Sequence, residues 1–88
     1  MSQDSDIIRV GKNAKVSALA ERVIKQLERQ GGLVRLEAVG AGAVYQAVKA
    51  VVQARRNGYL LAIIPALVDI PLGHGSQPAV QVTVVDME

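Results

Sequence analysis

Gly40-Ala41-Gly42-Ala43-Val44-Tyr45-Gln46-Ala47-Val48-Lys49-Ala50 is the stretch of sequence that decides the fold. A strand is predicted to end at Gly40, a glycine-alanine turn follows, and an amphipathic helix then runs to Arg56. The first turn of a helix has unpaired backbone N–H groups and the positive end of the helix dipole, which suits an anion. Gly40, Ala41 and Gly42 therefore form a candidate anion-binding turn.

The same turn departs from the known phosphate-binding patterns. Tyr45 stands where a dinucleotide fingerprint has its third glycine, and the lysine and hydroxyl of a phosphate-binding loop are missing. Close packing of the helix on the sheet is the favoured interpretation of the small residues. Donation of backbone N–H groups to a nucleic-acid phosphate remains the alternative.

The flanking sequence predicts a βαβαββ order, an α/β (α+β two-layer) sandwich with one mixed four-stranded sheet and two helices. Asn13 is predicted to cap the first helix, and the second helix is predicted to bury one set of its apolar residues. The region from Pro71 to Pro78 reads as a hairpin loop, and Pro65 indicates a bulge or an edge strand. The remaining predictions are strands at 7–10, 33–39, 59–64 (covered on both faces) and 79–85, a first helix ending at Glu28 before Gly31-Gly32, and a buried set of Val44, Ala47, Val48, Val51 and Val52.

Length and composition set the class of protein. The 88 residues are predicted to form one domain, 1–88, with residues 1–6 as a flexible N-terminus. Hydrophobic residues make up 50% of the chain without any Phe or Trp, so the core must be aliphatic. This is much apolar surface for a small chain, and we expect a homodimer or a higher homo-oligomer.

The chemistry-bearing residues are few. The chain has no cysteine and one histidine, and neither a nucleophile–base pair nor metal-ligand spacing is present, so we expect a non-enzyme without metal or cofactor. The longest apolar run, 59–68, is about half a membrane span and contains Pro65. We expect a cytoplasmic protein that does not enter a membrane. The net charge of +2 does not by itself indicate a polyanionic partner.

A basic cluster is the best candidate for a nucleic-acid contact. Lys12 and Lys15 flank Asn13 in the turn before the first helix, and Arg9 lies just upstream. Cations at a helix N-terminus oppose the dipole unless an anion binds there. The cluster therefore predicts either a phosphate-binding site or a solubilising surface loop.

Three further residues are secondary candidates. Arg55 and Arg56 stand at the negative end of the second helix, where neutralising the dipole is the favoured role and phosphate contact the alternative. His74 lies between Gly73 and Gly75 at the predicted hairpin tip. A lone histidine makes a poor metal site, so we expect it to be exposed, and a projecting tip of this kind also suits a minor groove.

Several motifs resemble the stage V sporulation protein S family. They are the turn and helix at 40–44 and 46–50, Ile64-Pro65-Ala66, and Asp69-Ile70. Tyr45 replaces the asparagine usual in that family, and the connection after Ala54 is shorter. The chain therefore resembles a divergent or related member.

That family in turn resembles Alba, a small dimeric archaeal chromatin protein with a βαβαββ order. The resemblance implies that the turn at Gly11-Lys12-Asn13 contacts nucleic acid, that the hairpin tip around His74 reaches toward a minor groove, and that two subunits pair. The function expected is non-catalytic binding of DNA or RNA with low sequence specificity. The alternatives are a protein-interaction or developmental regulator that binds no nucleic acid, and an oligomer that binds a small anion at the Gly40 turn.

Overall fold

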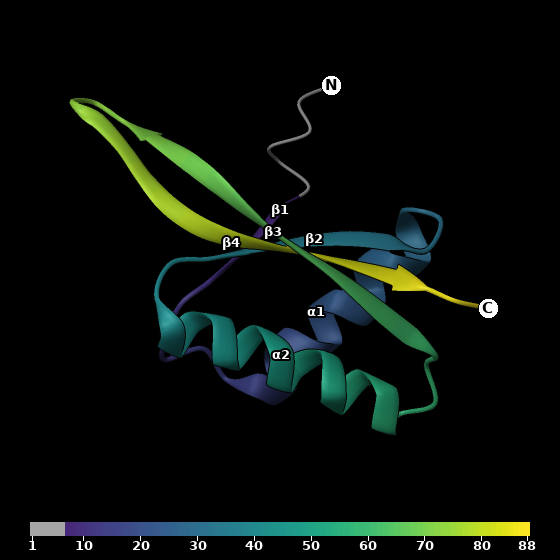
Figure 1. The fold of residues 1–88 in the computed structure, drawn as a ribbon. Helices are drawn as coiled ribbons and strands as arrows, with labels where there is room; N and C mark the ends of the chain where they lie inside the picture. Colours follow the sequence, from purple (N-terminus) through teal and green to yellow (C-terminus); the bar gives the residue numbers. More distant parts are fainter. Residues whose placement is uncertain (1–6) are drawn as a thin grey trace.

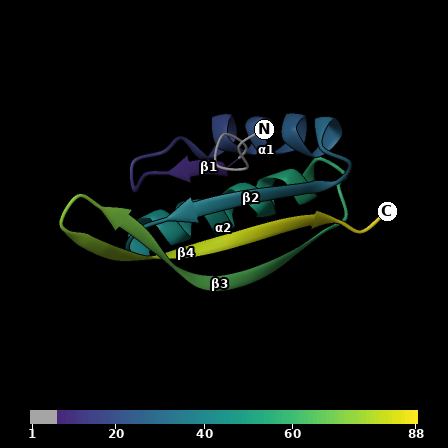
Figure 2. The ribbon, with the colours of Figure 1, turned by 90° about the horizontal axis from the view of Figure 1, so that it is seen from above.

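The computed structural model describes residues 7–88, so the prediction for residues 1–6 lies outside it. Two helices lie on one side of a four-stranded sheet (Figures 1 and 2). The elements are β1 (Ile7–Val10), α1 (Val16–Arg29), β2 (Leu33–Ala38), α2 (Ala41–Arg56), β3 (Leu61–Leu72) and β4 (Gly75–Asp86). The predicted βαβαββ order and two-layer α+β architecture are confirmed.

The sheet is mixed, as predicted, with the strand order β1-β2-β4-β3. β1 pairs with β2 in parallel, with Ile8 opposite Leu36. β4 pairs antiparallel with both β2 and β3, so that Val82 lies opposite Leu36 on one side and Pro65 on the other. β1 and β3 are therefore the two edges of the sheet.

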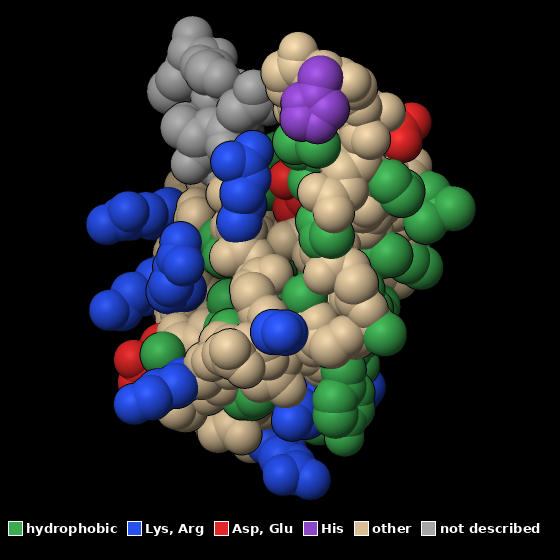
Figure 3. Space-filling view, turned by 90° about the vertical axis from the view of Figure 1, so that its left-hand side faces the viewer, with side chains coloured by type: hydrophobic (Ala, Val, Ile, Leu, Met, Phe, Trp, Pro, Cys, Tyr) green, Lys and Arg blue, Asp and Glu red, His purple; other side chains and the backbone are tan. Residues whose placement is uncertain are grey.

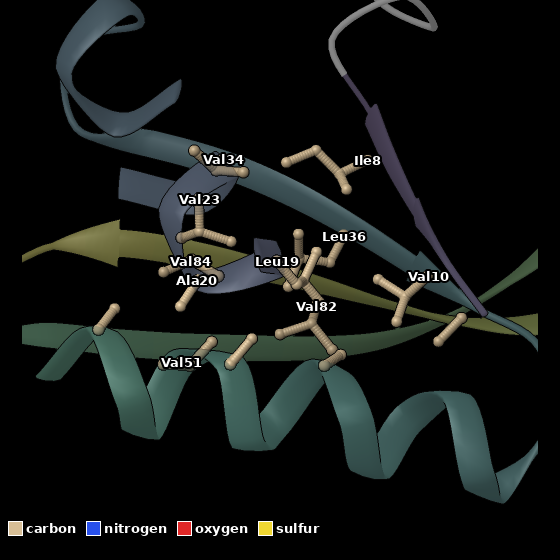
Figure 4. Packing of buried hydrophobic residues seen from close by; sticks show 14 of the residues in the cluster. Ile8, Val10, Leu19, Ala20, Val23, Val34, Leu36, Val51, Val82 and Val84 are labelled. Carbon is tan, nitrogen blue, oxygen red and sulfur yellow. The ribbon is translucent and has the colours of Figure 1, made fainter. Parts of the chain in front are cut away.

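The core lies between the helices and the inner face of the sheet, and it is wholly aliphatic (Figure 4). β2 shows the alternation of a sheet covered on one face: Val34, Leu36 and Ala38 are buried against the helices, while Arg35 lies on the outer face. The largest fully buried side chains are Ile8, Val23, Val34, Leu36, Val82 and Val84.

The first helix starts later than predicted, and Asn13 is not its cap. The Ala14 N–H donates to the Gly11 carbonyl at 3.1 Å, which closes a turn over Lys12 and Asn13. Lys15 is the N-cap residue. The predicted end is close: α1 finishes at Arg29, Gly31 has φ 70°, and the Gly32 N–H donates to the Leu27 carbonyl at 2.9 Å.

α2 has the predicted bounds, and Ala47 and Val51 are buried as predicted, but the rest of the buried face differs. Ala43, Ala47, Ala50, Val51 and Ala54 are buried, whereas Val52 is 44% exposed. Alanine side chains let the helix axis approach the sheet closely. The helix therefore packs on the sheet mainly through its alanine residues, and the bulkier valines at 44, 48 and 52 stay partly or largely exposed. Val44 and Val48, predicted to be buried, are only partly covered.

The last two strands are longer and more exposed than predicted. Ile63 and Ile64 of β3 are exposed by 37% and 59%, so the predicted coverage on both faces is wrong. β3 is an edge strand, which confirms the edge indicated by Pro65. The two strands pair as far as Leu72 opposite Gly75, so the predicted loop at Pro71–Pro78 is mostly strand. β2 pairs with β4 only over Val80–Val85, and the outer part of the hairpin is therefore a two-stranded ribbon that projects from the body (Figure 1). Proline is tolerated there because those edges are free.

Candidate functional site

The turn that carries Lys12 is exposed and lies against α2. Lys12, Asn13 and Lys15 are all exposed. The Gln46 side-chain amide in α2 donates to the Ala14 carbonyl at 2.6 Å. A Cβ atom added to Gly42 would lie 3.2 Å from the Lys12 Cβ, so the helix and the turn are in close contact.

Two more cations continue this surface along α2. Lys49 and Arg56 line a small hollow of about 220 Å³ together with Val16, the first residue of α1. Residues 42, 46, 49, 53 and 56 follow one another at spacings of four and three, so they share one face of the helix. We call Lys12, Lys15, Lys49 and Arg56 the basic track.

Lys49 also contacts Tyr45. The Lys49 Nζ lies 4.5 Å from the centroid of the Tyr45 ring, and 62% of Tyr45 is exposed. This cation–π contact holds Lys49, a member of the track, against the helix surface. The track thus lies next to an exposed aromatic ring.

Arg9 does not join the track. Its Nε donates to Glu37 Oε1 at 3.1 Å, and this pair lies on the outer face of the sheet. The Glu37 side chain is only 10% exposed, whereas the Arg9 side chain is 70% exposed. Arg9 therefore neutralises a nearly buried carboxylate.

His74 also lies apart from the track, whereas Arg55 adjoins its end and lines one hollow together with Arg56. Arg55 is one residue out of the helix face that carries Gln46, Lys49 and Arg56, and it borders a hollow with Tyr59 and Leu60. His74 is exposed at the hairpin turn, as predicted. From residue 57 to 85 the sequence contains no Lys or Arg, and Asp69 is its one acidic residue. The projecting hairpin thus carries no Lys or Arg side chain.

The Gly40 turn combines two packing roles. Gly40 has φ 87°, which favours glycine, and Gly42 lies against Lys12. Gly40 and Ala41 border an apolar groove of about 540 Å³ between α2 and the hairpin. Gly40 is thus required by its backbone conformation and Gly42 by its contact with the Lys12 turn, while Ala43 is the small residue of this segment that is buried in the core. The further residues that line the groove are Val44, Tyr45, Val48, Leu67, Pro78, Ala79 and Val80.

Side-chain charge is divided between the two layers. The helices with their flanking turns, residues 11–30 and 41–58, carry eight Lys and Arg against Glu21 and Glu28, a formal charge of +6. The remaining described residues carry two arginines against four carboxylates, a formal charge of −2. In Figure 3 the blue side chains gather along one side of the view and hydrophobic ones along the other. The modest net charge of the whole chain hides a strongly basic helix layer.

One tyrosine has a shifted pKa, outside the track. Packing around the phenol raises the pKa of Tyr59, and the negative charge of Glu28 and its hydrogen bond at 3.3 Å raise it further. Among residues 7–88, no three His, Cys, Asp or Glu side chains converge to hold a metal ion. No helix in the described range has the length and apolar character needed to cross a membrane.

Sequence reasoning missed the part that α2 plays at this site. No role is predicted for Gln46 from the sequence. For Lys49, near the middle of the second helix, the sequence leaves two roles open, a salt bridge or a contact with a nucleic-acid groove. The spacing of Gly42, Gln46, Lys49 and Gln53 marks one helix face, but only the tertiary structure shows that this face meets the Gly11–Val16 segment.

Two comparisons with known proteins agree with the architecture. A family model described as stage V sporulation protein S matches residues 6–87. Among solved structures, Alba from Thermoplasma volcanium is similar with a TM-score of 0.58 and 19% sequence identity, over 90% of this chain and 98% of that one. At this identity the second similarity concerns the fold, and it confirms the Alba-like architecture.

Proposed function

The chain belongs to the stage V sporulation protein S family, and on this scaffold we propose a small, non-catalytic protein that binds DNA or RNA with little sequence specificity. The observation that carries the proposal is the concentration of positive charge in the helix layer, where the basic track surrounds an exposed turn. Lys12, Lys15, Lys49 and Arg56 donate to phosphate oxygens. Contacts of this kind supply affinity without reading bases.

The other predicted contacts take different parts in this proposal. Asn13 lies within the exposed turn and donates to the backbone of the nucleic acid beside Lys12. Arg9 contributes little, because Glu37 already holds it. Arg55 and the His74 tip contact phosphates only where the nucleic acid extends past the track. The similarity to Alba supports a nucleic-acid ligand through the shared fold, and fold alone does not fix function.

Fluorescence anisotropy in low salt tests this proposal directly, with labelled duplex DNA, single-stranded DNA and RNA. Lys12→Glu should weaken binding by at least about tenfold, the effect of losing one charge-assisted hydrogen bond. Arg29→Glu is the matched control, since it makes the same charge change at the far end of α1, about 21 Å along the helix from Lys15. Absence of binding to all three nucleic acids, or equal losses in both variants, would overturn the proposal.

We also propose that the protein is a homodimer whose subunits pair through the apolar groove. Leu67 lines the groove with 83% of its surface exposed, and none of the described residues that line the groove is Lys, Arg, Asp or Glu. A protruding leucine next to an apolar hollow on the same surface suits a two-fold contact, in which each copy fills the groove of the other. The absence of charge from the groove lining means that pairing brings no like charges together there.

A second candidate function is favoured by one observation. The outer part of the hairpin, 68–79, projects from the body, has no Lys or Arg, and exposes Leu72 by 46%. Such a surface suits a protein partner better than a polyanion, in line with an interaction regulator. A partner that stays bound after nuclease treatment and is lost in Leu72→Asp, but retained in Lys12→Glu, would favour this function.

A further inference from the structure

We infer that Gln46 and Gly42 are positioning residues that hold the Lys12 turn in the conformation that binds phosphate. This inference rests on the proposed function and assigns a role to two residues of α2 that contact the turn rather than the ligand. It explains why the turn-and-helix motif at 40–50 accompanies a basic turn thirty residues earlier in the chain.

The first support is the hydrogen bond between the helix and the turn. Gln46 Nε2 donates to the Ala14 carbonyl at 2.6 Å, and the two residues are 32 positions apart in the chain. Ala14 itself donates its N–H to the Gly11 carbonyl. The Gln46 amide thus ties the closing residue of the turn to a helix whose other face is buried in the core.

The second support is the close approach at Gly42. An added Cβ would come within 3.2 Å of the Lys12 Cβ, the side-chain atom nearest to the backbone and the one least able to move aside. A larger residue at position 42 therefore displaces the turn at Lys12. Gly42 has an ordinary helical backbone, so its lack of a side chain is needed for this contact and not for a positive φ.

The third support is that, within the described residues, no capping or acidic side chain holds the start of α1, and apart from α2 the turn is held by the packing of Ala14 and Val16 against the core. Lys12, Asn13 and Lys15 are exposed, and α1 has neither a side-chain cap at Lys15 nor an acidic residue in its first turn. Three cations near the start of α1, Lys12, Lys15 and Lys49, repel one another and oppose the dipole of α1. A turn under this repulsion needs fixed contacts to keep its cations together, and α2 supplies them.

The decisive variant is Gln46→Met, which keeps the length of the side chain and every charge but removes the donor. Hydrogen exchange of the Ala14 amide in the free protein should become about five- to tenfold faster, the effect of losing one hydrogen bond. Gln53→Met is the matched control, because Gln53 lies on the same face of α2 but borders Val16 instead of the turn carbonyl. It should leave this exchange rate unchanged.

Binding assays with the same variants separate positioning from direct contact. Gln46→Met should lose about five- to tenfold in affinity for duplex DNA with an unchanged salt dependence, because all phosphate-binding cations remain. Lys12→Ala should lose affinity and also have a shallower salt dependence. Gly42→Ala should weaken binding without lowering the melting temperature, since alanine favours the helix while it displaces the turn.

The two proposals fail in different ways. Equal exchange rates at Ala14 in the wild type and Gln46→Met overturn the positioning role whether or not the protein binds nucleic acid. Equal affinity of the wild type, Gln46→Met and Gly42→Ala overturns it as well. Failure of the wild-type protein to bind any nucleic acid overturns the proposed function, and that outcome is read from the wild type alone.

Discussion

Replacing Leu67 by alanine should weaken the proposed homodimer strongly while leaving the fold of each chain intact. Leu67 is 83% exposed in the single chain, so folding of the subunit gains little from it. Burial of a leucine side chain contributes about 1.5–3 kcal/mol, and alanine retains part of this. We take the loss as about 1–2 kcal/mol for each subunit. Because a two-fold contact contains the residue twice, the dimer loses about 2–4 kcal/mol, and its dissociation constant rises roughly 30- to 700-fold.

Sedimentation equilibrium over a range of protein concentrations measures this constant. Leu72→Ala is the control, because Leu72 is also exposed but lies at the end of the hairpin and does not line the groove. It should leave the dimer unchanged. A wild-type protein that stays monomeric at high concentration, or a Leu67→Ala dissociation constant equal to that of the wild type, would refute pairing through the groove.

Three further predictions concern stability and titration. Arg9→Ala should lower the free energy of unfolding by about 1–2 kcal/mol in urea denaturation, because Glu37 is left nearly buried without its cation; a stability equal to that of the wild type would show that the pair contributes nothing. Ultraviolet titration of phenolate should show Tyr59 ionising above its ordinary pKa of 10.0. The folded state thus holds the Tyr59 proton more tightly than the unfolded state, so the stabilisation from this group is complete below pH 10.0 and is lost as the pH rises through the raised pKa. Glu28→Gln should move the Tyr59 pKa part of the way back to its ordinary value. A Tyr59 titration without any shift would contradict the contact with Glu28. Leu36→Ala should cost about 2–5 kcal/mol in the same urea experiment, since Leu36 is fully buried at the centre of the sheet, and a cost under about 1 kcal/mol would contradict that placement.

The sequence predicted those elements whose pattern is local. The alternation in β2 and the glycines after α1 are properties of consecutive residues, and patterns of this kind predicted the element order and the bounds of β1 and α2. The buried face of α2 was predicted correctly at Ala47 and Val51 and wrongly at Val44, Val48 and Val52, because the alanine and valine positions of the helix are both apolar. The packing distance between the helix and the sheet decides which positions are buried, and at the observed distance these are mainly the alanines.

The hairpin and the site depended on information that the sequence does not carry locally. Pro71 and Pro78 predict the ends of a loop, yet both stand in strands whose outer edges are free of further partners, whereas Pro65 lies in an edge strand as predicted. The exposed Lys12 turn was predicted from charge and glycine. Its contact with Gln46 was not, because 32 residues separate Gln46 from Ala14 and only the fold brings them together.

A salt titration of duplex DNA binding tests the central claim most directly, because each phosphate contact changes the logarithmic slope by about 0.9. If the four cations of the basic track all contact phosphates, the slope is about −3.6 for each bound chain, and Lys12→Ala reduces its magnitude by about 0.9. Arg29→Ala, at the far end of α1, should leave the slope unchanged. An affinity that does not depend on salt, or a Lys12→Ala slope equal to that of the wild type, would contradict phosphate binding by the basic track.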